Sequence, residues 1–240
     1  MPVSSPATTD VVVLCGGRGT RLGPLTTHTP KPLLSVNGEP FLLRRLRALR
    51  AEGFQRILLA VHYLAPQFHA FARACVGEFP NLAVVEEPIP LGTGGALRHV
   101  IRHVQSPVCV VLNGDSWGTQ AVTPVLEAHA RRGARFTMVV VRAEQVEGNV
   151  RRKGMVMLGA EGAIQGFATG DANGPQWVNA GVYVLDRALI QGWPEGSYDL
   201  EQQFLSLVPR GSGWAFLSDE PLLDIGTPDC YELANQRSLS

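Results

Sequence analysis

The chain carries no net charge, because its 240 residues include 21 Lys and Arg against 21 Asp and Glu. Such a balance does not suggest the basic stripe of a nucleic-acid-binding protein or a partner on an anionic membrane. No apolar run approaches the roughly 20 residues that a membrane-spanning helix requires, and the first residues contain no apolar signal core. We therefore expect a cytoplasmic protein with neither nucleic acid nor membrane among its partners.

Cysteine patterns for metal or disulfide chemistry are also missing. The four cysteines, Cys15, Cys75, Cys109 and Cys230, are isolated and show no CxxC spacing. Two of them lie in apolar strand patterns, where cysteine commonly packs as a small hydrophobic residue. The sequence therefore supports neither a zinc site nor a disulfide framework.

The first half of the chain alternates apolar strands with amphipathic helices. We expect strands over residues 10–15, 56–62, 82–85 and 108–112, and helices over about 40–52, 68–75 and 93–104. Strands separated by helices of this length form βαβ crossovers and a parallel sheet, whose ligands bind at the carboxyl ends of the strands. Beyond residue 132 the sheet is expected to become mixed, with strands over 136–141, 154–158, 163–167 and 177–185.

These patterns predict a single α/β domain with a Rossmann-like, doubly wound fold, in which helices cover both faces of a mixed, mainly parallel sheet. We place the domain at residues 10–240, after a flexible N-terminal tail at residues 1–9 that is rich in Pro, Ser and Thr. The helix at about 40–52 also carries four arginines, which we expect on its solvent side: Arg44, Arg45, Arg47 and Arg50.

A glycine loop follows the first strand. Its glycines permit positive φ angles and let backbone N–H groups approach an anion, as in a phosphate-binding nest. The loop glycines are Gly16, Gly17 and Gly19, and the nearby cations are Arg18, Arg21 and Lys31. The spacing matches neither a P-loop nor a dinucleotide fingerprint. A lone glycine cluster favours a tight turn, but its combination with Arg21 and Lys31 indicates an enzyme that handles a nucleoside triphosphate.

Two aspartates are candidate metal ligands. Asp115 follows the strand at 108–112, so it lies at the same sheet edge as the glycine loop. Asp224 is the second candidate. Two carboxylates together with phosphate oxygens and water are the usual environment of Mg²⁺, which is the cofactor we expect. The alternative for a single Asp after a strand is a turn or a helix cap.

Six motifs occur in order between about residues 10 and 235. They are Gly-Gly-x-Gly-Thr-Arg-Leu from Gly16, Thr-Pro-Lys-Pro-Leu from Thr29, Glu87-Pro88 with Leu91-Gly92-Thr93-Gly94-Gly95-Ala96, Asn113-Gly114-Asp115, Asn179-Ala180-Gly181-Val182-Tyr183, and Asp224-Ile225-Gly226-Thr227-Pro228. Together they resemble the sugar-1-phosphate nucleotidylyltransferase family. The short length and the Asp199-Leu200-Glu201-x-x-Phe204 element are most similar to its D-glycero-D-manno-heptose 1-phosphate guanylyltransferase branch.

The resemblance implies a reaction between a nucleoside triphosphate, here GTP, and a sugar 1-phosphate, here the heptose 1-phosphate, to give a nucleoside diphosphate sugar and pyrophosphate. It implies catalytic roles for Arg21 and Lys31 and metal ligation by Asp115 and Asp224. The implied nucleotide-binding residues, in a half at about 10–132, are Leu14, Gly16, Gly17, Arg18, Gly19, Thr20, Glu87, Gly92, Thr93 and Asn113. The implied sugar-phosphate-binding residues, in a half at about 133–240, are Gly154, Asn179, Gly181 and Glu201.

One element of the family is missing. Many relatives carry Phe-x-Glu-Lys, whose acidic and basic residues help to hold the sugar phosphate, whereas this chain has Phe167-Ala168-Thr169-Gly170. We hypothesise that a cation just before Gly154, namely Arg151, Arg152 or Lys153, binds the sugar phosphate instead. The alternative is a solvated basic turn.

Two other functions stay open. A uridylyltransferase acting on N-acetylmuramate 1-phosphate or another hexose 1-phosphate is the nearest enzyme alternative, because that branch shares His-Thr-Pro-Lys-Pro-Leu. A non-catalytic nucleotide-sugar-binding regulatory protein is favoured by the missing Glu-Lys pair, although intact Arg21, Lys31, Asp115 and Asp224 argue against it. The sequence leaves the base and the oligomeric state open, with a homo-oligomer as one option.

Overall fold

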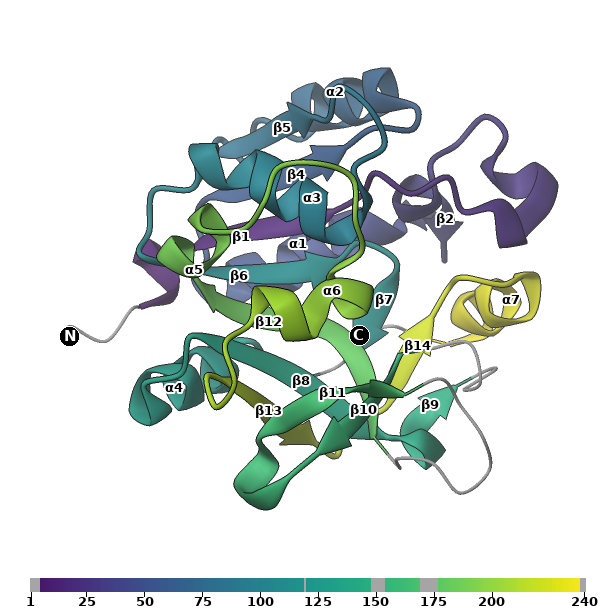
Figure 1. Cartoon of the computed structure of the whole chain (residues 1–240). Helices are drawn as coiled ribbons and strands as arrows, with labels where there is room; N and C mark the ends of the chain where they lie inside the picture. The colour runs from purple at the N-terminus through teal and green to yellow at the C-terminus, as the bar shows by residue number, and fades with distance from the viewer. Residues whose placement is uncertain (1–4, 119, 148–153, 169–176, 238–240) are drawn as a thin grey trace.

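Four parallel strands form the centre of the structure, a computed structural model that describes residues 5–118, 120–147, 154–168 and 177–237. They are β1 (Asp10–Leu14), β4 (Ile57–Val61), β5 (Leu82–Glu86) and β6 (Val108–Asn113). β1 lies between β4 and β6, and β5 pairs with the outer side of β4 (Figure 1). Because all four run in one direction, their carboxyl ends meet at a single edge, where ligands of such sheets bind.

Strands from the second half of the chain continue the same sheet in mixed directions. They are β8 (Phe136–Arg142), β10 (Met155–Leu158), β11 (Ile164–Ala168), β12 (Trp177–Asp186) and β13 (Gly213–Ser218). β12 is antiparallel to β6, β8 and β10, whereas β13 is parallel to β8. Within the described residues this makes one nine-stranded sheet. The predicted mixed sheet with a parallel core is confirmed.

Helices cover both faces of the sheet, as predicted. One apolar core includes residues of α1 (Phe41–Ala51), α2 (Ala65–Ala74) and α4 (Thr123–Arg132). The other includes residues of α3 (Gly92–Val100), α5 (Arg187–Gln191) and α6 (Leu200–Leu207), which lie in front of the sheet in Figure 1. Val11 and Val13 of β1 face the first core and Val12 faces the second, and all three are fully buried. A strand buried on both faces has no polar side, which explains its uninterrupted apolar sequence.

A smaller unit lies beside the carboxyl end of β6. Its elements are β2 (Ser35–Val36), β3 (Glu39–Pro40), β7 (Ser116–Gly118), β9 (Val146–Glu147), β14 (Leu222–Asp224) and α7 (Pro228–Gln236). A separate apolar cluster holds it together: Val36, Phe41, Trp117, Leu223, Ile225 and Ala234. These strands have no recognisable pattern in the sequence, because two or three residues are too few to show an alternation of apolar and polar residues.

Arg45 corrects the prediction that all four arginines of α1 lie on the solvent side. Its guanidinium is buried, lies 5.8 Å from the centre of the Trp117 ring, and donates from Nη1 to the Gly118 carbonyl oxygen at 3.1 Å. Burial lowers the pKa of Arg45 to about 10, although nearby Glu52 opposes the change. The spacing of Arg45 from the buried Leu42, Leu46 and Leu49 already places it on the apolar face of the helix.

Two boundaries also differ from expectation. The helix predicted over 93–104 ends at Val100 and continues as the 3₁₀ turn Ile101–His103. The described end of the expected tail is folded, with a 3₁₀ turn at Pro6–Thr8 and a buried Thr9 whose hydroxyl donates to the Ser5 carbonyl at 2.7 Å. Across the described residues, no helix is at once long and apolar enough to cross a membrane.

Candidate active site

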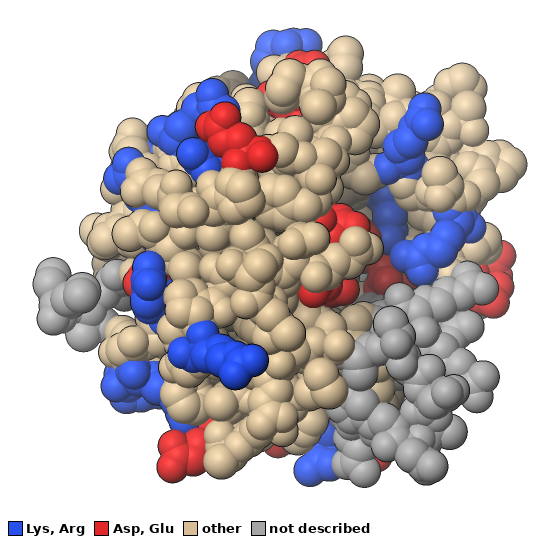
Figure 2. Space-filling model, viewed as in Figure 1, with Lys and Arg blue, Asp and Glu red and all other residues tan. Residues whose placement is uncertain are grey.

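A cavity of about 710 Å³ opens at the carboxyl edge of the parallel strands. Each strand contributes the residues that follow it: the glycine loop after β1, His62 and Tyr63 after β4, Glu87 after β5, and Asn113 with Asp115 from the end of β6. In Figure 2, acidic and basic side chains gather around a hollow on this face of the molecule. The cavity therefore lies where parallel α/β sheets bind their ligands.

All ten predicted nucleotide-binding residues line this cavity: Leu14, Gly16, Gly17, Arg18, Gly19, Thr20, Glu87, Gly92, Thr93 and Asn113. Two of the loop glycines lie in close contact with charged side chains. A Cβ on Gly16 would lie 2.6 Å from Glu87 Oε1, and Gly19 has a φ of 65° with Lys31 Cβ only 3.2 Å from the place of its missing Cβ. The loop is thereby held against the two charged residues that face the cavity.

Arg21, Lys31, Asp115 and Asp224 meet at one place beside the cavity. Lys31 Nζ lies 2.8 Å from Asp115 Oδ2 and 3.2 Å from Asp224 Oδ1. A Cβ on Gly226 would lie 2.9 Å from Arg21 Nη2, from Lys31 Nζ and from Asp224 Oδ1. Four charged residues from distant parts of the sequence thus converge as the hypothesis of a triphosphate site requires.

The two carboxylates owe their positions to a short β ladder. β14 pairs antiparallel with β7, which places Asp224 opposite Ser116, and the Ile225 amide donates to the Asp115 carbonyl oxygen at 3.2 Å. Burial lowers the pKa of Lys31, but Asp115 and Asp224 more than offset this effect, so the pKa is raised. The ammonium therefore remains charged at neutral pH.

Asp115 and Asp224 fit Mg²⁺ as ligands, because both present carboxylate oxygens, the hard donors this ion prefers, at one point. The side chain of Asp115 is 37% exposed and so is open to the cavity. The described residues contain no group of three or more His, Cys, Asp and Glu that could hold a metal. Two carboxylates leave most of an octahedral shell to water and phosphate oxygens, as is usual for this ion.

The four described sugar-site candidates form a second cluster. Asn179 Nδ2 donates to Glu201 Oε1 and to the Tyr183 hydroxyl, both at 2.6 Å. A Cβ on Gly154 would lie 2.6 Å from Glu201 Oε2, and one on Gly181 would lie 2.7 Å from Asn113 Nδ2. The cluster thus adjoins Asn113, which lines the cavity at the carboxyl edge of the parallel strands.

A β-bulge positions this cluster. The register of β12 against β8 shifts between Asn179 and Tyr183, and Gly181 within the shift has a φ of 72°, a conformation that favours glycine. The Asn179 side chain accepts from the Gly181 amide at 2.9 Å, which fixes the bulge. Lys153, with Arg151 and Arg152, lies outside the described residues, as do Thr169 and Gly170.

The glycine run at 92–95 serves a packing role that the sequence did not reveal. The amides of Gly94 and Gly95 donate to the Tyr198 carbonyl oxygen at 3.0 and 3.2 Å, and the Leu200 amide donates to Thr93 Oγ1 at 2.9 Å. A Cβ on Gly95 would lie 2.1 Å from the Gly196 carbonyl oxygen. The start of α3 is therefore clamped against the segment that leads to Glu201.

Sequence reasoning missed several residues of the site. Tyr63 lies under the Arg18 guanidinium at 5.4 Å and donates to the Thr26 carbonyl oxygen at 3.0 Å, so it joins the loop to the segment after it. Its place after β4 could have been found by the carboxyl-edge rule that identified Asp115. Tyr183, whose pKa is raised by burial and by Glu201, was hidden in an apolar run.

Cys15 lines the cavity and is buried there. Burial raises the pKa of its thiol, and Asp115 and Glu87 raise it further. Only the thiolate form of cysteine is strongly nucleophilic. This environment disfavours Cys15 as a nucleophile.

Known proteins resemble this chain over most of its length. The family model described as Nucleotidyl transferase matches residues 10–239. A mannose-1-phosphate guanylyltransferase of Mycobacterium tuberculosis is 32% identical over 227 residues, which are 92% of this chain but 62% of that protein, so the chain spans less than two thirds of its length. A D-glycero-alpha-D-manno-heptose 1-phosphate guanylyltransferase of Aneurinibacillus thermoaerophilus is 26% identical over 230 residues, covering 95% of this chain and 97% of the relative.

A solved structure gives the same picture. HddC from Yersinia pseudotuberculosis, in a crystal complex with GMP-PN, superposes with a TM-score of 0.82 at 27% identity, covering 95% of this chain and 98% of that one.

Replacing Gly95 by alanine tests the clamp between α3 and the 196–200 segment. We expect Gly95→Ala to lower the free energy of unfolding by about 1–3 kcal/mol, because the new methyl group collides with a backbone carbonyl that cannot rotate away. Urea unfolding measures the change. The matched control is Gly77→Ala, since a Cβ there meets no atom within 4 Å. Equal midpoints for both variants contradict the clamp.

Proposed function

The chain belongs to the nucleotidyl transferase family, and from this premise we propose that it joins a nucleoside triphosphate to a sugar 1-phosphate and releases pyrophosphate. The observation that carries the proposal is the convergence of Arg21 and Lys31 with Asp115 and Asp224 beside the glycine loop. A triphosphate and a sugar phosphate repel each other, so a site that brings them together needs fixed positive charge.

In the proposed reaction an oxygen of the sugar phosphate attacks the α-phosphorus. A bond forms between this oxygen and phosphorus while the bond from phosphorus to the α–β bridging oxygen breaks, and pyrophosphate leaves with the electron pair. Phosphoryl chemistry of this kind depends mainly on positioning and on stabilisation of charge. Lys31 stabilises the α-phosphate, and Arg21 holds the outer phosphates. Bound Mg²⁺ would neutralise further negative charge on the triphosphate.

The sugar phosphate is proposed to bind beside the Asn179 cluster. Glu201 presents a carboxylate that can accept hydrogen bonds from sugar hydroxyls, and Asn179 donates to that carboxylate and orients it. Gly154 lets the Glu201 carboxylate lie against the backbone, because a side chain there would collide with it. Asn113 separates this cluster from the nucleotide cavity by the width of one side chain. This spacing suits two substrates that must touch at the α-phosphorus.

Glu87 supports guanine as the base. Its side chain is buried at the cavity wall, with Oε2 accepting from the Leu91 amide at 3.1 Å and Oε1 directed toward Gly16. A carboxylate offers only acceptors, and guanine presents two neighbouring donors, N1–H and the 2-amino group. Uracil and thymine present one N–H between two carbonyl oxygens, which a carboxylate repels. Burial raises the pKa of Glu87, opposed by the Leu91 amide, so binding of guanine through the ionised carboxylate is expected to weaken toward acid pH.

The sugar we propose is D-glycero-D-manno-heptose 1-phosphate. The support is that the heptose relative is matched along almost its full length, whereas the mannose relative is matched over only part of its own. Mannose 1-phosphate has the same ring configuration and is the nearest competitor.

A pyrophosphate-release screen tests the function. ATP, CTP, GTP, UTP and dTTP are each paired with heptose 1-phosphate, mannose 1-phosphate and N-acetylmuramate 1-phosphate in the presence of Mg²⁺. We expect the highest kcat/KM with GTP and the heptose, and loss of turnover when EDTA removes the metal. Highest activity with UTP and N-acetylmuramate 1-phosphate favours the uridylyltransferase instead. Binding without turnover in every pair favours a regulatory protein.

Removing the Lys31 ammonium tests its proposed role at the α-phosphate. We expect Lys31→Ala to lower kcat by about 10²-fold or more, which is roughly 3 kcal/mol of transition-state stabilisation. Arg73→Ala is the control, because it removes one positive charge from an exposed position of α2. Circular dichroism verifies that both variants are folded. Activity of Lys31→Ala within tenfold of the wild type removes Lys31 from the catalytic set.

Replacing Glu87 by glutamine tests base selection. Glutamine has the same shape but turns one acceptor into a donor that faces guanine, so we expect kcat/KM for GTP to fall by about 10²-fold. Inosine triphosphate lacks the 2-amino group, so its kcat/KM should fall less than that of GTP. The ratio of kcat/KM for GTP to kcat/KM for inosine triphosphate should therefore approach one in the variant. Glu86→Gln is the control, because the neighbouring carboxylate is exposed and pairs with His69 at 3.6 Å. An unchanged ratio in Glu87→Gln contradicts the proposed contact.

A further inference from the structure

The hairpin formed by β2 and β3 turns at Asn37 and Gly38. Both residues have positive φ angles, 51° and 83°, the combination that a tight two-residue hairpin turn requires. Each strand contributes only two residues, with Ser35 opposite Pro40 and Val36 opposite Glu39. A ladder this short is marginal by itself, so the hairpin depends on contacts with the rest of the protein.

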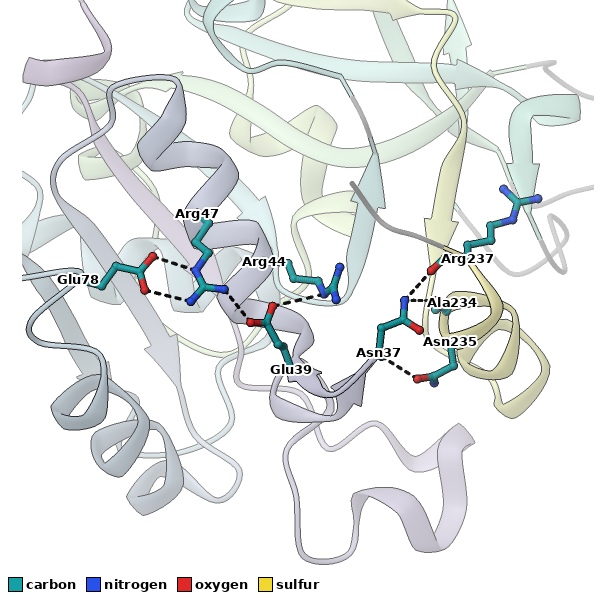
Figure 3. A network of polar contacts seen from close by, with 8 residues as sticks. All are labelled: Asn37, Glu39, Arg44, Arg47, Glu78, Ala234, Asn235 and Arg237. Atoms are coloured by element: carbon teal, nitrogen blue, oxygen red, sulfur yellow. Dashed lines mark hydrogen bonds and ion pairs between the residues drawn. The ribbon is translucent and has the colours of Figure 1, made fainter.

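Asn37 makes those contacts with the end of α7 (Figure 3). Its amide N–H donates to Asn235 Oδ1 at 3.0 Å, and its side-chain Nδ2 donates to the carbonyl oxygens of Arg237 at 2.5 Å and Ala234 at 3.5 Å. The last carbonyl groups of a helix have no partners within the helix. Asn37 therefore caps α7 from a segment almost 200 residues away in the sequence.

The two segments that Asn37 joins, the β2–β3 hairpin and α7, each follow a charged residue of the site closely in the sequence. Lys31 precedes the hairpin by four residues, and Asp224 precedes α7 by four residues. Tyr231 of α7 donates from its hydroxyl to the Ser35 carbonyl oxygen at 2.5 Å, which adds a second link between hairpin and helix. Beneath the clasp, Val36 of the hairpin packs in the same apolar cluster as Leu223 and Ile225, the two neighbours of Asp224.

The hairpin is also fastened on its other side. Glu39 Oε1 accepts from Arg47 Nη1 at 2.8 Å, and Arg47 Nε donates to Glu78 at 2.9 Å (Figure 3). The hairpin thus braces α7 against α1, and α1 belongs to the main core. These contacts therefore fix the position of Asp224 relative to Lys31, because they attach both segments to the main core through α1.

We propose that Asn37 is a positioning residue for the divalent cation: by clasping α7 it holds Asp224 in register with Asp115 and Lys31. This inference rests on the proposed function, in which both aspartates bind the metal. Asn37 does not touch the substrates. Its loss is expected to let α7 and the loop of Asp224 shift, which weakens the metal-dependent part of nucleotide binding and leaves the glycine loop in place.

The test compares GTP binding with and without metal. Calorimetry gives the Kd of GTP in EDTA and the Kd of GTP in Mg²⁺. The Kd in EDTA divided by the Kd in Mg²⁺ measures how much the metal strengthens GTP binding. Asn37→Gly removes the side-chain donor but keeps the positive φ and the charge, and Asn235→Ala removes the acceptor from the helix side. Asn81→Gly is the matched control, the same substitution at an exposed turn. Hydrogen exchange of residues 227–236 reports the clasp directly.

We expect the ratio to fall by about fivefold in Asn37→Gly and Asn235→Ala, the effect of one lost hydrogen bond, with faster exchange in α7 and unchanged binding in EDTA. Asn81→Gly should match the wild type. Faster exchange in α7 with an unchanged ratio overturns the proposal, because the clasp is then only structural. A wild-type ratio of one overturns the metal role itself, and with it the corresponding part of the proposed function. If Asn37→Gly does not fold, Asn235→Ala decides alone, because alanine is a favourable helix residue.

Discussion

The contact of the buried Lys31 ammonium with Asp115 and Asp224 is the constraint on which the rest of the site depends. A lysine side chain that is 6% exposed has lost most of its hydration, and only carboxylates held at hydrogen-bond distance offset that loss. The three residues stand at positions 31, 115 and 224, so most of the chain must be folded before they meet. The β7–β14 ladder and the apolar cluster around Val36 hold the segments that make this contact.

Those parts of the site that follow a long strand could be predicted from the sequence. β1 and β6 are continuous apolar runs, so their ends are visible, and the carboxyl-edge rule places Gly16 and Asp115 together. Asp224 ends a strand of three residues, and its place opposite Ser116 is a pairing between distant segments that no local pattern reveals. Only the resemblance of the motifs to a known family indicated it.

The role of the glycines at 92–95 and the burial of Arg45 could not be predicted from the sequence, because both depend on packing between segments that are distant in the chain. The resemblance gave the glycine run at 92–95 only a ligand-binding role, yet two of its amides are used by the Tyr198 carbonyl, and the lack of a side chain at Gly95 is explained by the nearby Gly196 backbone. Arg45 was predicted to be in solvent but is buried. Its spacing placed it on the buried face, but its charge suggested solvent, and the Gly118 carbonyl and the Trp117 ring are the partners that make its burial tolerable.

A division into a nucleotide half and a sugar half describes the order of the motifs better than the site itself. Asp199 lines the cavity proposed to bind the nucleotide although it comes from the second half, and Thr93 accepts a hydrogen bond from Leu200, the residue before Glu201. Asn113, from the first half, lies against Gly181 in the bulge. Transfer between two phosphates requires the α-phosphorus and the attacking oxygen to come within a few ångströms of each other. If the two substrates bind as proposed, their pockets must share walls, so residues from both halves have to interleave, and a shift of either segment affects the binding of both substrates.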